Sequence, residues 1–155
     1  MAEPDAPVEA VETLLEHVVR ALGLDARIEV LDDGETVTGT LHGEDLGLFI
    51  GRHGQTIDAV QHLAQRIAGV RAADGRRIAI DAEGYRERRE TMVQRQADQA
   101  VDDALRTGRA VALDAMTAGE RRLVHEYLRD NDEVQTYSEG DEPHRHLVIA
   151  PADEA

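Results

Sequence analysis

The sequence predicts an α+β fold made of two small units in succession. In each half of the chain, segments with apolar residues at three- and four-residue steps are followed by short runs in which apolar and polar residues alternate. The first pattern is typical of an amphipathic helix and the second of a half-buried strand. A length of 155 residues, of which 41% are hydrophobic and 32% charged, suits one ordinary domain or two small ones.

The first unit opens with a helix and a β-hairpin. After a short tail over residues 1–7, a single apolar stripe predicts a helix over 8–22, formed by Val8, Val11, Leu14, Leu15, Val18, Val19 and Leu22. Two strands are predicted near 28–30 and 36–41, because β-favouring residues there flank an Asp-Asp-Gly turn.

A short helix, a longer helix and a strand complete the first unit. The apolar segment 46–50 is followed by a second stripe, which predicts a helix from near Gln55 to Gly69. After a turn at Asp74-Gly75, alternation predicts a strand over 78–80. The order in this unit is therefore helix, strand, strand, short helix, helix, strand.

The second unit also mixes helices and strands. A long helix is predicted over 85–106 and a brief strand over 111–113. Thr117 is placed to cap a further helix, and strands follow over 134–137 and 146–150. Four arginines on the long helix either extend a phosphate-binding track between the domains or form ion pairs within the helix, where Glu87 and Glu90 lie among them: Arg86, Arg88, Arg89 and Arg95.

Charge is distributed unevenly along the chain. The 32 acidic and 17 basic residues give a net charge of −15, which by itself disfavours nucleic-acid binding. Residues 1–50 carry 12 acidic residues and two arginines, and residues 132–155 carry seven and one. The middle, 51–131, has 13 acidic residues and 14 arginines. Binding of a nucleic acid would therefore depend on a local arginine surface, and it should be modest and sensitive to salt.

Several classes of function are excluded or disfavoured. The absence of cysteine excludes disulfides, zinc–thiolate sites and cysteine nucleophiles. There is no Walker loop, nucleophile elbow or pair of acids typical of an enzyme, and no third metal ligand beside His144 and His146. We therefore expect no catalysis, no cofactor and no metal site. Without a signal peptide or an apolar run of about 18 residues, the protein is expected in the cytoplasm with no membrane insertion.

The segment Gly51-Arg52-His53-Gly54 carries the clearest functional signal. Its two glycines permit close approach of a partner to the backbone, and it leads into a helix whose first N–H groups carry partial positive charge. Arg52 adds a full charge beside them. A negatively charged strand is the natural ligand, although the same spacing also occurs in ordinary turns between helices. His53 either donates to a phosphate or fills a variable loop position.

A second motif pairs Arg121 with His125. Residues four apart share one face of a helix, so both side chains can donate to one phosphate. The alternative is a solvated helix face on which the arginines pair with Glu120 or Glu126. The segment 138–149, which reads Ser-Glu-Gly-Asp-Glu-Pro-His-Arg-His-Leu-Val-Ile, favours the phosphate-binding interpretation.

With its αββααβ order and its GxxG loop, the segment 8–83 resembles a type II KH domain. In KH domains this loop clamps the backbone of about four single-stranded nucleotides, while the bases lie across the adjoining helix and strand. By this resemblance, the clamp is formed by Gly51, Arg52, His53 and Gly54. The resemblance also implies that Ile50 and Ile57 supply the apolar floor beneath the bases.

Residues 84–155 look like a connecting helix together with the small nucleic-acid-binding domain named for an Arg and a His separated by three residues, here the Arg-xxx-His domain. A KH domain followed by this domain is typical of the bacterial Jag (KhpB) family. The resemblance implies that both domains bind single-stranded RNA, with Arg121 and His125 as the signature pair and Arg145 as a nearby contact. It also implies a link to cell elongation and division, and pairing with a small lone-KH-domain protein in a homo- or heterodimer. Many members carry an extra N-terminal domain, where this sequence has residues 1–7.

We therefore predict a single-stranded RNA-binding protein that acts as a bacterial post-transcriptional regulator and not as an enzyme. The alternative is a protein-interaction adaptor that uses the KH fold for dimerisation or docking. The net acidity favours the adaptor, and the intact Gly51–Gly54 loop favours RNA binding.

Overall fold

The computed structural model describes residues 5–69 and 75–153, and it confirms the predicted α+β class. The chain forms two compact units, the first ending at Arg86 and the second beginning at Glu87. The predicted turn at Asp74-Gly75 falls partly outside the described residues, because Asp74 is not among them.

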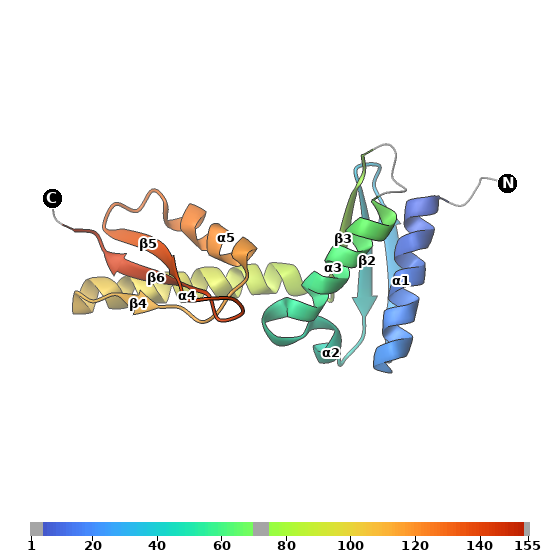
Figure 1. The fold of residues 1–155 in the computed structure, drawn as a ribbon, viewed down its shortest axis with the longest axis horizontal. Coiled ribbons are helices and arrows are strands. Elements are labelled where there is room, and N and C mark those ends of the chain that lie inside the picture. The colour runs from blue at the N-terminus through green and yellow to red at the C-terminus, as the bar shows by residue number, and fades with distance from the viewer. Residues whose placement is uncertain (1–4, 70–74, 154–155) are drawn as a thin grey trace. The chain divides into compact units, whose positions relative to one another are not determined.

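The first unit has the predicted order of elements (Figure 1). Its elements are α1 (Ala6–Leu22), β1 (Arg27–Asp32), β2 (Thr36–His42), α2 (Gly47–Ile50), the 3₁₀ turn η1 (Arg52–Gly54), α3 (Gln55–Ala68) and β3 (Arg77–Ala82). Helix α1 begins at Ala6, two residues before the helix start predicted at Val8. Pro7 is accepted in this first turn, where its missing N–H would have no helical partner in any case.

Asp5 occupies the N-cap position of α1 but makes no side-chain cap hydrogen bond. Instead, its two carboxylate oxygens accept hydrogen bonds from Arg76 at 2.7 and 3.0 Å. The hydrogen bond and the charge of Arg76 hold the pKa of the Asp5 carboxyl below its usual value. Arg76 also donates to Asp32 at the end of β1, so this cation links the start of α1 to the hairpin.

Strand β2 lies at the centre of a three-stranded sheet, antiparallel to β1 and parallel to β3. Its buried residues Val37, Gly39 and Leu41 alternate with partly exposed neighbours, so one face of the sheet packs against the helices. A Cβ at Gly39 would lie 2.6 Å from the side chain of Val11 and 2.7 Å from that of Leu15. Helix α1 therefore packs directly on the backbone of β2.

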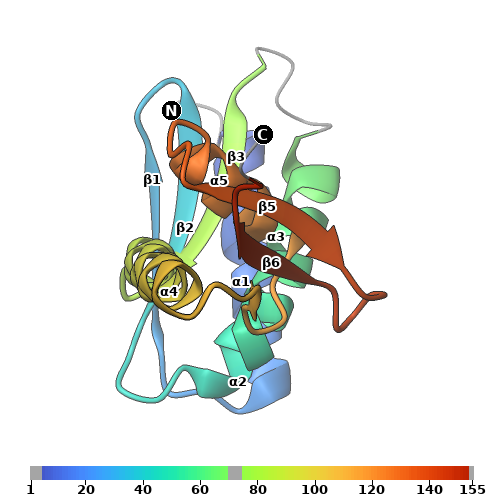
Figure 2. The same cartoon turned by 90° about the vertical axis from the view of Figure 1, so that its left-hand side faces the viewer.

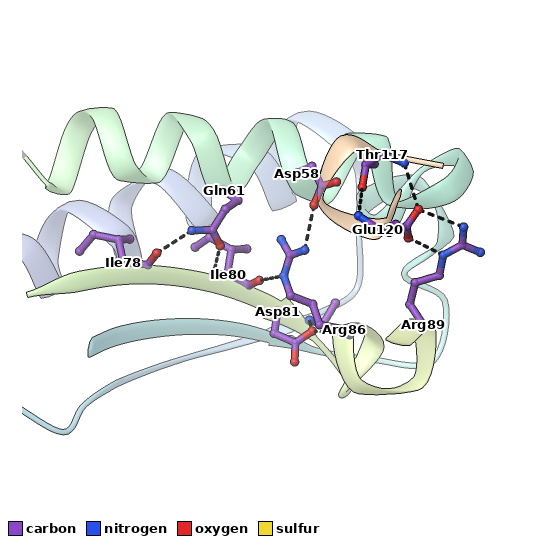
Figure 3. Close-up of polar contacts among 10 residues, drawn as sticks. Asp58, Gln61, Ile78, Ile80, Asp81, Arg86, Arg89, Thr117 and Glu120 are labelled. Atoms are coloured by element: carbon purple, nitrogen blue, oxygen red, sulfur yellow. Dashed lines mark hydrogen bonds and ion pairs between the residues drawn. The ribbon is translucent and has the colours of Figure 1, made fainter. Parts of the chain in front are cut away.

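The outer edge of β3 faces no further strand within the described residues. In place of a neighbouring strand, the side-chain amide of Gln61 on α3 forms hydrogen bonds with this edge (Figure 3). Its nitrogen donates to the carbonyl oxygen of Ile78 at 2.5 Å, and its oxygen accepts from the N–H of Ile80 at 2.6 Å. Arg86 Nε donates to the carbonyl oxygen of Ile80 at 2.8 Å. These contacts satisfy edge groups that could otherwise pair with another chain.

The second unit is built on α4 (Tyr85–Thr107), whose first two residues belong to the first unit. It continues with β4 (Val111–Ala112), α5 (Ala118–Leu128), β5 (Val134–Glu139) and β6 (His146–Pro151). Strand β6 lies between β4 and β5 and is antiparallel to both. Leu147 and Ile149 of β6 join a core with apolar residues of α4 and α5, and Figure 2 shows α5 behind β5.

Thr117 caps α5 as the sequence predicts. Its hydroxyl accepts from the N–H of Glu120 at 3.3 Å, and the Glu120 carboxylate accepts from the N–H of Thr117 at 3.1 Å. Arg89 of α4 donates to the same carboxylate at 2.6 Å (Figure 3). Arg89 therefore forms an ion pair with a glutamate on α5, whereas one of the two alternatives for these arginines was ion pairing within their own helix.

Candidate nucleic-acid interface

The loop between α2 and α3 has an unusual backbone. Gly51 has φ 74° and ψ 175°, and His53 and Gly54 follow with φ values of 56° and 77°. L-residues rarely adopt positive φ, so glycine is favoured at both ends of the loop. A Cβ at Gly51 would also lie 2.2 Å from Thr56 Oγ1, which excludes any side chain there.

This backbone presents Arg52 to solvent at the start of α3. The Arg52 side chain is exposed, His53 is partly exposed, and no carboxylate within residues 5–69 and 75–153 pairs with Arg52. A guanidinium binds phosphate strongly when no internal anion competes for it. The N–H groups in the first turn of α3 add partial positive charge at the same place. The loop can therefore contact an anion through a side chain and through backbone amides.

The two isoleucines predicted to support bases differ in position. Ile50, at the end of α2, is partly buried and packs against the core of the first unit. Ile57 is 0% exposed, so it offers no surface to a base. The prediction of a direct contact for Ile57 is therefore corrected: its side chain packs inside the core beneath the loop. The apolar periodicity of α3 places this residue on the buried face of the helix.

The first two residues of α4 lie against the loop and the first turn of α3. A Cβ on Gly54 would lie 2.7 Å from Tyr85 Oη and 3.1 Å from Tyr85 Cε1, so the tyrosine ring covers this glycine. Arg86 Nη1 donates to Asp58 Oδ1 at 2.8 Å (Figure 3). The N–H of Arg86 donates to Asp81 Oδ1 at 3.2 Å. Sequence reasoning placed Tyr85 in the join between the two domains but assigned it no such role.

In the second unit, Arg121 is largely buried, with 9% of the residue exposed. Its Nη1 donates to the carbonyl oxygen of Met116 at 2.7 Å, and its Nη2 donates to Glu142 Oε1 at 2.9 Å. The Glu142 side chain is 62% exposed, so a surface carboxylate covers a buried guanidinium. The alternative of a solvated helix face therefore does not apply to Arg121, whose carboxylate partner is Glu142 and not Glu120 or Glu126.

His125 and Arg145 remain closer to solvent than Arg121. The Nδ1 of His125, which is exposed on α5, lies 2.6 Å from Thr136 Oγ1 on β5. Arg145 is partly exposed, and its Nη1 donates to the carbonyl oxygen of Gly140 at 3.3 Å. No direct hydrogen bond joins Arg121 to His125 in the described part of the second unit.

Two further features bear on function. In the described ranges, no three His, Asp or Glu side chains are grouped so that they could hold a metal ion. None of the helices among these residues has the length and hydrophobicity needed to span a bilayer.

Two family models match the chain on either side of the start of α4. The KhpA/KhpB KH-domain model matches residues 8–81, and the model of the Arg-xxx-His domain matches residues 91–151. Among curated relatives, the RNA-binding protein KhpB of Lactiplantibacillus plantarum is 37% identical over 96% of this chain. The RNA-binding protein KhpB of Clostridium symbiosum is 35% identical over 88% of this chain. The RNA-binding protein KhpB of Bacillus subtilis is 29% identical over 97% of this chain. The chain thus carries a KH domain of the KhpA/KhpB type followed by an Arg-xxx-His domain, and it is similar to KhpB proteins over most of its length.

The chain spans only part of the length of the KhpB relatives that it matches. It covers 46% of the length of the Lactiplantibacillus protein, 62% of the Clostridium protein and 73% of the Bacillus protein. The Gly51–Gly54 loop falls within the matched KH domain, and Arg121, His125 and Arg145 fall within the matched Arg-xxx-His domain. Tyr85 falls outside both matched ranges.

Proposed function

We propose that this chain binds single-stranded RNA, and that the loop Gly51–Gly54 makes the main contact with the sugar-phosphate backbone. The observation that carries the proposal is the exposed Arg52, which stands on a glycine-bounded loop at the start of α3 with no paired carboxylate in the described residues. The relatives, which are named RNA-binding proteins, support the same class of ligand.

A single strand fits the charge of this protein better than a duplex does. A duplex has two phosphate strands along one axis, so a protein with a net charge of −15 repels it more strongly than it repels a single strand. The short Gly51–Gly54 loop can bind through contacts with only a few phosphates of one strand. Unstacked bases can then approach the neighbouring α3, which they cannot do in a duplex.

The Arg-xxx-His domain supplies the second proposed contact. His125 and Arg145 are accessible there, and a phosphate could reach Arg121 by displacing the Glu142 carboxylate from its Nη2. Carboxylate and phosphate oxygens use the same guanidinium donors, so the two anions compete for this site.

The family resemblance supports a wider proposal as well. In this view the chain regulates RNA in the cytoplasm, in connection with cell elongation and division, and pairs with a small lone-KH-domain protein. The net charge of −15 favours the alternative of an adaptor that does not need RNA. If the chain is such an adaptor, it should not bind single-stranded RNA in a fluorescence anisotropy titration.

Binding of RNA should depend on strand state and on salt. We expect a labelled single-stranded RNA of about 12 nucleotides to bind more tightly than the same sequence as a duplex, because one KH loop contacts about four unpaired nucleotides. Between about 50 and about 200 mM salt, the logarithm of the binding constant should fall with a slope of about −0.7 per neutralised phosphate. Fluorescence anisotropy measures both quantities. Equal affinity for strand and duplex, or a salt-independent affinity, would contradict the proposal.

Replacing Glu142 by Gln should strengthen RNA binding. The amide keeps an oxygen that can accept from Arg121 Nη2, but it removes the negative charge that competes with phosphate. We expect a gain in affinity of about threefold, equivalent to about 0.7 kcal/mol. Asp141→Asn is the matched control, because it removes the same charge from the neighbouring exposed residue without touching Arg121. Equal gains in both variants would mean that only the net charge matters.

A further inference from the structure

We infer that Tyr85 is a positioning residue, whose ring holds the Gly51–Gly54 loop in its RNA-binding conformation. This inference rests on the function proposed above. Tyr85 lies outside the matched KH range, 8–81, and outside the matched Arg-xxx-His range, 91–151. It nevertheless belongs to the first compact unit, together with the loop. The loop is strained, the Tyr85 ring lies against it, and the start of α4 is anchored to β3 and α3.

The loop needs support because its conformation is locally unfavourable. His53 and Gly54 follow one another with positive φ, and His53 is one of only two non-glycine residues with positive φ in the described chain. Such a conformation is strained for a residue with a side chain, and it persists only where the surrounding structure holds it. A loop that relaxed from this conformation would no longer present Arg52 and the first N–H groups of α3 to the same phosphates.

The ring of Tyr85 provides this support at Gly54. A Cβ at Gly54 would lie 2.7, 3.1 and 3.3 Å from Oη, Cε1 and Cζ of the ring, so the Cα of this glycine is in contact with it. Gly54 is accordingly buried, whereas Arg52 is exposed. One side of the loop is thus held by the ring, and the other is left for a ligand. Glycine is required here both for its φ of 77° and for the close approach of the ring.

The ring itself is anchored by the next residue in the chain. Arg86 donates through its backbone to Asp81 Oδ1, through Nε to the carbonyl oxygen of Ile80, and through Nη1 to Asp58 (Figure 3). Asp58 lies in the first turn of α3, directly after the loop. The start of α4 is therefore fixed to β3 and to α3 at once, and the Tyr85 ring is held at a defined place over Gly54.

Replacing Tyr85 by Ala should weaken binding of a labelled random-sequence single-stranded RNA of about 12 nucleotides by about tenfold, because a loosened loop loses part of its charge-assisted contacts. Tyr85→Phe keeps the ring carbons against Gly54 and should bind within about twofold of wild type. In 15N spectra without RNA, Tyr85→Ala should shift the amide signals of residues 51–54. Tyr85→Leu gives a second test if the alanine variant is poorly folded, since it retains bulk without a flat ring.

Ile28→Ala is the control for general destabilisation. Ile28 is partly buried against the same core, but it lies on β1, which packs on α1 and β2. This variant should lose stability while keeping both its RNA affinity and its loop signals.

The results separate the two proposals. If Arg52→Asp/His53→Asp binds RNA as well as wild type, the loop is not the clamp and the proposed function fails. If that variant loses binding while Tyr85→Ala does not, the clamp stands and the role of Tyr85 is overturned. Equal losses in Tyr85→Phe and Tyr85→Ala would also overturn it, because the ring carbons would then make no contribution.

Discussion

Replacing Arg52 and His53 together by Asp should weaken binding of single-stranded RNA by on the order of 100-fold, or about 2.7 kcal/mol. Arg52 is the exposed, unpaired cation of the loop in the described chain, so its loss removes a charge-assisted hydrogen bond to phosphate. The two new carboxylates would also repel the RNA backbone. Neither side chain is part of the buried core, so the fold should be retained.

Anisotropy titrations at several salt concentrations measure this effect. Loss of the Arg52 contact should also make the salt slope shallower by about 0.7. His17→Asp/Arg20→Asp is the matched control, because it makes the same pair of substitutions at exposed positions of α1. If both double variants weaken binding equally, the net charge and not the loop determines affinity. If neither does, RNA is not held by the loop.

The second large effect concerns stability. Replacing Arg121 by Ala should lower the free energy of unfolding of the second unit by about 2 kcal/mol. The substitution leaves the carbonyl oxygen of Met116 without its 2.7 Å partner and removes a largely buried side chain from beside the core. It also frees Glu142 and the exposed turn that carries it. Weaker RNA binding by this variant would therefore include a contribution from folding.

Because the chain has no tryptophan, urea unfolding is best followed by circular dichroism. Arg122→Ala is a close control: this neighbour on α5 has a 79% exposed side chain and an ion pair with Glu126 on the same helix. We expect a cost below about 0.5 kcal/mol for it, as for other exposed helix pairs. Similar costs for the two variants would show that the burial of Arg121 contributes nothing to stability.

The order of elements was predictable because the signals for it are local. Apolar residues at helical or alternating spacing mark the elements from α1 to β3 and from α4 to β6, and their observed ends lie close to those predicted. Gly23, with φ 64°, ends α1, and Thr117 with Glu120 forms the capping box of α5. Each of these signals involves residues within one helical turn of each other.

Residues that support the fold and the candidate site from outside the motifs were harder to predict from the sequence. Gln61 satisfies the edge of β3, Glu142 covers Arg121, and Tyr85 covers Gly54. None of the three belongs to the GxxG or Arg-xxx-His motif. Their roles depend on partners far along the chain, such as Glu142, which is 21 residues from Arg121.

The amino-acid sequence alone determined the α+β class, the two glycines that bound the loop and the placement of Arg52 between them, because backbone conformation and helix periodicity depend on near neighbours. Only the tertiary structure decided which of the candidate side chains reach solvent. It left Arg52 exposed but buried Ile57 and covered Arg121. Burial depends on contacts between distant segments, and a motif read along the chain carries no information about them.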